Sequence, residues 1–223
     1  MKLYCLNKIV LSIRNNAAQF LNGLASNTLD QPRNAFLTVH GRIVATFDQL
    51  KISDDEVWAV IEAPFKEDLL KHLGKYALLN KTVIEALNMH VYYDLEGSYP
   101  VGDDQKCIPQ KVGKLILSPN ELQSNISDEE SLKFRLRNNI PVHGIDYKDE
   151  LILNVDEHEF VSYTKGCFLG QEPVAKVHNR SKPSWKLVVR YEDELSDEEK
   201  AKMTSRFKEP SGRTMGFVFV SNQ

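Results

Sequence analysis

Hydrophobic and polar positions alternate near the start of the chain and then change to a helical spacing. Ile9, Leu11 and Ile13 occupy every second position, which is typical of a half-buried strand. The asparagines at positions 15 and 16 predict a helix cap, and apolar residues then recur every three or four positions from Ala17 to Leu24. The pattern predicts a strand over 9–13 followed by an amphipathic helix over 17–24.

The next segment predicts a hairpin and a second helix. Residues 35–50 form two apolar runs that meet at His40 and Gly41, where glycine can adopt the positive φ of a tight turn. Another strand is expected over 56–63. Pro64 suits the first position of a helix that extends to about Leu79 with one apolar face.

The second half of the chain mixes both kinds of element. Strands are expected over 82–87, 90–95, 114–117 and 215–220. Capping-box patterns begin at Ser127 and Ser196, and Ile140-Pro141 is expected to end the first of these two helices. Strands and helices do not alternate strictly, so the predicted fold class is α+β with mixed, largely antiparallel sheets.

Composition and charge narrow the class of protein. The chain has 223 residues, of which 42% are hydrophobic and 26% charged, as in soluble globular proteins. The formal net charge of −3 provides no overall basic field for nucleic acid, so direct nucleic-acid binding is not predicted. The basic residues between Lys176 and Arg190 are typical of a solvated face.

The sequence favours a cytoplasmic protein without a membrane span. Polar residues from Asn7 to Arg14 interrupt the first apolar run, and no stretch approaches the roughly 20 apolar residues of a membrane helix. Cys5, Cys107 and Cys167 are widely separated, which argues against a disulfide framework and for a reducing compartment. Because no two Cys or His residues have the spacing of metal ligands, no metal site is predicted.

Candidate chemistry is concentrated in residues 163–172, YTKGCFLGQE. Residues 160–163 are predicted to end a strand and Gln171 to begin a helix, which places Cys167 in a glycine-rich connection. The helix N-terminus and the neighbouring Lys165 both favour the thiolate form of Cys167. The alternative is that Cys167 is a small buried apolar residue.

A second candidate is Arg42, directly after the turn glycine Gly41. Its planar guanidinium could bind the carboxylate of an acidic small molecule. The alternative is an exposed turn arginine without a ligand.

Four segments, in this order, resemble the YgfZ family of folate-binding proteins, which are relatives of the glycine cleavage T-protein (aminomethyltransferase). They are residues 20–27 (FLNGLASN), 41–45 (GRIVA), 135–141 (RLRNNIP) and 165–172 (KGCFLGQE). The resemblance implies a T-protein-like folate-binding region over 1–186, as one unit or two interlocked subdomains. It also implies that 187–223 is a truncated C-terminal β-barrel remnant, which we expect to form one hairpin and a helix.

The function implied by the resemblance is that of a folate-binding accessory protein. Such a protein supports iron–sulfur cluster assembly or repair in client enzymes, including tRNA-modifying ones, and binds tetrahydrofolate or a derivative. The resemblance assigns the reactive thiol to Cys167. It assigns the cofactor-binding residues to the turn and the motif, at Gly41, Arg42, Lys165, Gly166, Gly170, Gln171 and Glu172.

Two departures from the aminomethyltransferases define the alternatives. Their pair of aspartates corresponds to Ala45-Thr46 here, with Asp48 as the only nearby carboxylate, which disfavours aminomethyl transfer. A tetrahydrofolate-dependent one-carbon transferase that uses Asp48 is the first alternative. Arg137 stands where the T-protein has a pterin-binding glutamate, so the second alternative is a non-catalytic interaction module that has lost folate binding.

Overall fold

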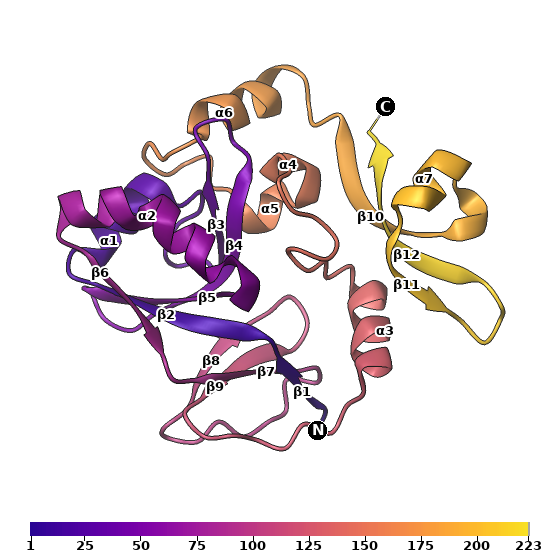
Figure 1. Cartoon of the computed structure of the whole chain (residues 1–223), viewed down its shortest axis with the longest axis horizontal. Coiled ribbons are helices and arrows are strands. Elements are labelled where there is room, and N and C mark those ends of the chain that lie inside the picture. The colour runs from indigo at the N-terminus through magenta and orange to yellow at the C-terminus, as the bar shows by residue number, and fades with distance from the viewer. Residues whose placement is uncertain (223) are drawn as a thin grey trace.

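Strands pair in three antiparallel sheets in the computed structural model, which describes residues 1–222 (Figure 1). The largest sheet has the order β3-β4-β5-β2-β6. Its strands are β2 (Lys8–Arg14), β3 (Arg33–Leu37), β4 (Ile43–Lys51), β5 (Glu56–Glu62) and β6 (Val83–Leu87). The predicted α+β class with antiparallel sheets is confirmed.

Two helices cover one face of this five-stranded sheet. They are α1 (Ala17–Leu24) and α2 (Lys66–Asn80), the second preceded by the 3-10 turn η1 (Ala63–Phe65). Phe20 of α1 and Leu69 of α2 pack in one cluster with Leu11 and Ile13 of β2. The helical spacing of apolar residues therefore predicted this core correctly.

Strand β2 is buried on both faces, and the expected half-buried strand is wrong in this respect. Leu11 and Ile13 face the helices, whereas Val10 packs against Val91 and Leu117 of a second sheet. Asn16 occupies the N-cap position of α1 as expected, but it adopts φ 57 and makes no side-chain cap hydrogen bond. Its side-chain amide donates to the backbone carbonyl of Asn80 at the end of α2.

The second sheet has the order β1-β7-β9-β8 and stacks on the face of the first sheet that the helices leave open. It contains β1 (Leu3–Leu6), β7 (His90–Asp94), β8 (Lys106–Pro109) and β9 (Lys114–Ser118). The two outer strands β1 and β8 were not predicted. Each has four residues, too few for an alternating pattern to stand out.

Four helices join this pair of sheets to the C-terminal region (Figure 1). They are α3 (Asp128–Asn138), α4 (Ile152–Val155), α5 (Glu157–Phe160) and α6 (Gln171–Arg180). The Ser127 capping box starts α3 as predicted. The strand end predicted over 160–163 is wrong, because the Asp156 carboxylate accepts from the amides of His158 and Glu159 and starts α5 instead.

The C-terminal region forms a three-stranded sheet of order β10-β12-β11 rather than the expected single hairpin. Its elements are β10 (Trp185–Tyr191), η2 (Glu192–Glu194), α7 (Asp197–Lys202), β11 (Thr204–Lys208) and β12 (Thr214–Ser221). Leu187, Phe207 and Phe217 pack this sheet onto α3 and α4. The predicted boundary after residue 186 falls inside β10. None of the helices over residues 1–222 is both long and apolar enough to span a bilayer.

Candidate functional site

A cavity of about 360 Å³ lies between the five-stranded sheet, the four-stranded sheet and α3. Its size is within the range of about 300–1,000 Å³ that is typical of small-molecule sites. Much of the wall is apolar or aromatic, from Leu6, Tyr93, Leu95, Leu115, Leu132, Phe134, Ile140, Pro141, Val142 and Ile145. Such walls suit a planar or aromatic ligand.

Strand alternation places charged side chains on the cavity wall. Apolar residues of β2 and β4 such as Leu11 and Phe47 face the helices, so the even-numbered Lys8 and Asp48 point to the opposite face. Glu62 is the register partner of Lys8, and Arg33 is the register partner of Asp48. Side chains of opposite charge on neighbouring strands thus lie on the same face of the sheet.

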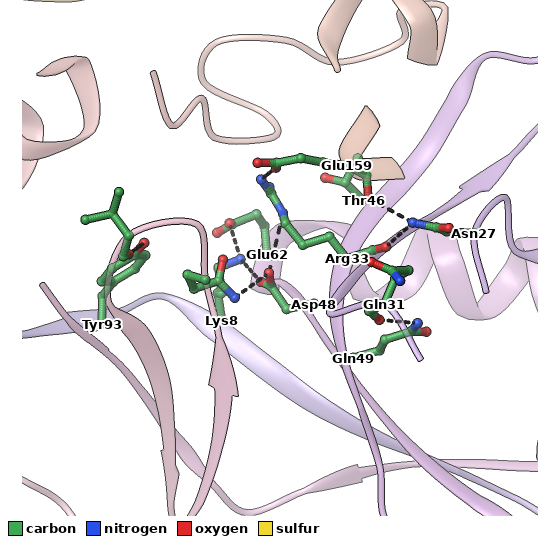
Figure 2. A network of polar contacts seen from close by, with 12 residues as sticks. Lys8, Asn27, Gln31, Arg33, Thr46, Asp48, Gln49, Glu62, Tyr93 and Glu159 are labelled. Atoms are coloured by element: carbon green, nitrogen blue, oxygen red, sulfur yellow. Dashed lines mark hydrogen bonds and ion pairs between the residues drawn. The ribbon is translucent and has the colours of Figure 1, made fainter. Parts of the chain in front are cut away.

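These four side chains and Glu159 form one network of ion pairs (Figure 2). Lys8 Nζ lies 3.1 Å from Asp48 Oδ2 and 3.0 Å from Glu62 Oε1. Arg33 Nε lies 3.6 Å from Asp48 Oδ1, and the Arg33 guanidinium also pairs with Glu159 of α5. Asp48 therefore has two cationic partners.

The network is fixed in its charged form. Burial disfavours the ammonium of Lys8, but Asp48 and Glu62 more than offset this and raise the pKa of Lys8 above its ordinary value. Burial likewise disfavours the Arg33 guanidinium, while Asp48 and Glu159 raise its pKa. Gln110 Nε2 donates to Asp48 Oδ1 at 3.1 Å and occupies a further acceptor position of this carboxylate. Both oxygens of Asp48 therefore already have partners within the protein.

A second polar group on the wall consists of Thr46, His143 and Tyr147. The hydroxyls of Thr46 and Tyr147 are 2.8 Å apart, and burial raises the pKa of Tyr147 to about 12. The His143 ring stacks between Phe65 and Tyr147, with centroid distances of 3.8 and 5.3 Å. Burial lowers the pKa of His143 to about 4, with Lys8 and Lys148 adding to the effect, so the imidazole is neutral at pH 7.

The motif residues predicted to bind a cofactor lie elsewhere. None of the eight predicted site residues is among those that line the cavity. Cys167 is exposed in the connection between α5 and α6, a helix-to-helix loop rather than the expected strand-to-helix loop. The alternative interpretation of Cys167 as a buried apolar residue is therefore wrong.

Lys165 anchors the motif loop to the end of α1. Its ammonium donates to the Ala25 carbonyl at 2.6 Å and to the Asn27 carbonyl at 3.0 Å. Burial lowers the pKa of Lys165 to about 8. The Leu169 amide donates to the Gly23 carbonyl at 3.0 Å and fixes the same loop. These contacts give Lys165 a structural role, and its predicted part in cofactor binding stays a prediction.

The two motifs that stood out in the sequence do meet in space. A Cβ built on Gly170, which has φ +83, would lie 3.4 Å from Gly41 Cα. Gly41 adopts φ +74 as predicted for the hairpin turn and packs against Pro173 and Val174 in the first turn of α6. Arg42 is exposed, and its Nη1 donates to the Asp149 carbonyl at 2.6 Å.

Of the other motif residues, two lie at the start of α6 and one lies in the loop before it. Gln171 and Glu172 form its first turn, where Glu172 complements the helix dipole. A Cβ on Gly166 would meet no atom within 4 Å. The predicted role of these residues and of Gly41 and Arg42 in cofactor binding stays a prediction.

The residue that faces the cavity from α3 is Arg135, not Arg137. Arg137 is exposed and does not line the cavity, whereas Arg135 does and pairs with Asp146 at 3.3 Å. Arg137, which stands where the T-protein has a pterin-binding glutamate, thus lies outside the cavity, and the loss of folate binding inferred from it stays a prediction. Asp48, the only carboxylate near Ala45-Thr46 in the sequence, lies on the cavity wall.

Sequence reasoning missed most of the cavity residues. Lys8 and Glu62 stand at the ends of apolar strands, and a charge at an inward-facing position of such a strand is a usable signal. His143 and Tyr147 lie in the turn after Pro141, which has no periodic pattern. No sequence signal places them beside Phe65.

Over residues 1–222, no three His, Cys, Asp or Glu side chains are grouped closely enough to hold a metal ion.

Comparisons with known proteins identify the fold. No protein-family model matches the sequence, and no curated protein matches it. Among solved structures, the chain is similar to the crystal structure of the glycine cleavage system aminomethyltransferase T from Bartonella henselae, with a TM-score of 0.75. The match covers 99% of this chain and 78% of that chain at 14% sequence identity. The chain therefore has a T-protein-like fold.

Proposed function

We propose that the protein binds a folate-type ligand, tetrahydrofolate or a derivative, in the central cavity. The observation that carries this proposal is the cavity itself, an aromatic-walled space of about 360 Å³ inside a T-protein-like fold. The residues that would hold the ligand are Tyr93, Phe134, Arg135, His143 and Tyr147. When bound, a tetrahydrofolate supplies one-carbon carrier chemistry.

We further propose that the protein acts as an accessory protein for iron–sulfur client enzymes, including tRNA-modifying ones, with Cys167 as its working thiol. The exposure of Cys167 supports this role because a partner protein can reach it. The cluster would belong to the client, since this chain offers no set of metal ligands over residues 1–222.

The paired state of Asp48 favours this function over one-carbon transfer. A transferase needs a carboxylate that can accept and release a proton at the pterin. Both oxygens of Asp48 are engaged by Lys8, Arg33 and Gln110 rather than turned to a ligand. Measurement of tetrahydrofolate-dependent methylene transfer with wild type and Asp48→Asn addresses the alternative. Turnover that depends on Asp48 would show that the accessory function is wrong.

Ligand binding and thiol function are tested separately. Calorimetric titration with folinic acid is expected to give a saturable curve for the wild type and for Cys167→Ser, because Cys167 does not line the cavity. The absence of binding to the wild type would favour the interaction module instead. In a strain that lacks the protein, Cys167→Ser is expected not to restore the activity of iron–sulfur enzymes. Cys107→Ser, a change of the same kind on β8 and outside the cavity wall, is expected to restore it.

A further inference from the structure

The loop that carries Cys167 has little backbone anchoring of its own. It joins α5 to α6, and in the described part of the chain no residue from Tyr163 to Cys167 makes a backbone–backbone hydrogen bond. The amides of Ser162 and Leu169, on either side of this segment, donate to carbonyls of residues 23–26. A surface segment without backbone hydrogen bonds opens at little cost in free energy. The position of Cys167 therefore depends on side chains.

Two side chains of this segment bind partners outside the loop. Lys165 donates to the carbonyls of Ala25 and Asn27, which ties the loop to the end of α1. On the other side, the Tyr163 hydroxyl donates to Glu157 Oε2 at 2.7 Å. Glu157 is the first residue of α5, so this bond ties the loop to the helix before it.

The same carboxylate oxygen also binds the helix after the loop. His178 of α6 lies with Nδ1 2.9 Å from Glu157 Oε2, and its ring stacks on Tyr163 with 3.8 Å between centroids and 24° between planes. A carboxylate only accepts hydrogen bonds, so the His178 proton at this contact is on Nδ1. We call Glu157, Tyr163 and His178 the Glu157 clamp. It joins the two helices between which Cys167 lies.

The charge state of the clamp suits this role. Burial disfavours the Glu157 carboxylate, but the hydrogen bonds from Tyr163 and His178 more than offset this and lower its pKa. Burial and the Glu157 carboxylate both raise the pKa of Tyr163, so the hydroxyl keeps the proton that it donates. Glu157 is thus the common acceptor of two donors that come from opposite ends of the loop.

We propose that the Glu157 clamp positions Cys167, by holding its loop in one arrangement from which the exposed thiol meets a partner protein in a fixed direction. This inference rests on the proposed function of Cys167 as a working thiol and adds which residues prepare it. Ordering a flexible loop costs free energy when a partner binds, and a loop that is ordered beforehand avoids this cost. Tyr163, Glu157 and His178 are positioning residues in this sense.

The mobility of Cys167 is the direct test. In Cys5→Ser/Cys107→Ser, Cys167 is the only thiol, and a nitroxide label on it reports the order of the loop by electron paramagnetic resonance. Tyr163→Phe keeps the ring and removes only the hydroxyl. Loss of this hydrogen bond to a carboxylate is expected to raise the ratio of mobile to immobile label about tenfold. The matched control is Tyr191→Phe, whose hydroxyl donates to Glu209 at 3.2 Å beside the C-terminal sheet, and its spectrum should be unchanged.

A double-variant comparison shows whether Tyr163 acts through Glu157. Glu157→Ala removes the shared acceptor, so the addition of Tyr163→Phe to it should mobilise the label no further. Melting temperatures should stay near that of the labelled parent, because Tyr163 and His178 are exposed. An unchanged spectrum in Tyr163→Phe would overturn the inference, as would additive effects of the two changes. Mobility that appears only together with a lower melting temperature would also overturn it.

The activity of iron–sulfur enzymes in a strain that lacks the protein links the clamp to function. Tyr163→Phe is expected to restore less activity than the wild type and more than Cys167→Ser, whereas Tyr191→Phe should restore it fully. If Cys167→Ser fails but Tyr163→Phe restores full activity, the positioning role is wrong and the proposed function of Cys167 stands. If Cys167→Ser itself restores full activity, the proposed function is wrong and this inference falls with it, whatever the spectra show.

Discussion

Lys8 Nζ and Asp48 Oδ2 lie 3.1 Å apart, although strand β5 separates their two strands in the sheet. The long lysine side chain crosses β5 and also reaches Glu62, its register partner on that strand. One cation thus joins three adjacent strands on the face that lines the cavity. These ion pairs therefore stabilise the sheet in addition to lining the cavity.

Replacement of Lys8 by methionine is expected to destabilise the protein by about 3 kcal/mol, because Glu62 is left without a cation in a poorly solvated place and Asp48 keeps only Arg33. Urea unfolding at pH 7 measures the change. Lys51→Met is the control, since its pair with Asp54 is exposed and its loss should have no measurable effect. Equal stability of Lys8→Met and wild type would show that Lys8 does not hold the three strands together.

The same pair predicts a loss of stability in alkali. The pKa of Lys8 is raised in the folded state, so its stabilising contribution is complete below its ordinary pKa of 10.5 and is lost as the pH rises through the higher folded-state value. The difference in unfolding free energy between wild type and Lys8→Met should therefore shrink above about pH 10.5. A difference that stays constant over this range would contradict the assignment.

The lowered pKa of His143 predicts a loss of stability in acid rather than in alkali. Its pKa is lowered from 6.5 to about 4 in the folded state, so between these values the unfolded chain binds a proton that the folded protein does not. The stability of the wild type should fall as the pH decreases from 6.5 to 4, and His143→Phe should lack this component. Between pH 7 and pH 5 the two proteins are expected to diverge by about 2 kcal/mol in unfolding free energy. Parallel curves for wild type and His143→Phe would mean that His143 is already charged or solvated.

The sequence predicted correctly those elements that depend on interactions between residues close together in the chain. The capping box at Ser127 starts α3, and the turn glycine Gly41 has the positive φ that the hairpin requires. The strand end expected over 160–163 was wrong. The apolar run there is short, and the side chain of Asp156 upstream caps a helix instead. The missed strands β1 and β8 depend on pairing with residues far away in the chain, as Leu3 does with Asp94.

The site was harder to predict than the fold. Cys167 stood out because of its glycines, and the structure shows an exposed thiol outside the cavity. The cavity itself is formed by side chains such as Lys8 and His143, whose partners lie in other elements. Strand alternation shows that Lys8 points away from the helices, but only the stacking of two sheets reveals that a cavity lies on that side. The position of His143 between Phe65 and Tyr147 depends wholly on tertiary structure.

Asp146 connects the cavity wall to the C-terminal sheet, and its replacement is expected to loosen that sheet. Its buried carboxylate pairs with Arg135, accepts from the Val142 amide at 2.8 Å and accepts from the Thr204 hydroxyl at 2.8 Å. Asp146→Asn removes the charge and turns one acceptor into a donor, which should cost about 2–3 kcal/mol.

Hydrogen exchange measures where the loss occurs. Amides of β11 and β12 are expected to exchange faster in Asp146→Asn, whereas those of β2 and β5 should be unchanged. Asp193→Asn is the control, because Asp193 in η2 makes an exposed pair with Arg213, directly before β12 of the same sheet. Equal protection of β11 in the Asp146 variant and in the wild type would show that Asp146 does not couple the two regions.

The two glycines of the motif are expected to respond differently to alanine. A Cβ on Gly170 would lie 2.4 Å from the Thr38 carbonyl oxygen and 3.2 Å from Leu37 Cβ, at a φ of +83 that alanine disfavours. Backbone atoms cannot move aside as a flexible side chain can, so Gly170→Ala should destabilise the protein by about 3 kcal/mol. A Cβ on Gly166 would meet nothing within 4 Å, so Gly166→Ala should leave the stability almost unchanged.

Thermal unfolding of the two variants, together with calorimetric titration of folinic acid, separates packing from ligand binding. Neither glycine lines the cavity, so the folded fraction of both variants should bind with the affinity of the wild type. A stable Gly170→Ala variant would show that the hairpin turn and the motif loop are not in close contact. A variant of Gly166 that is stable but no longer binds folinic acid would instead place the motif loop at the ligand, as the sequence resemblance implies. The pair of substitutions thus decides whether the glycines around Cys167 serve the fold or the cofactor.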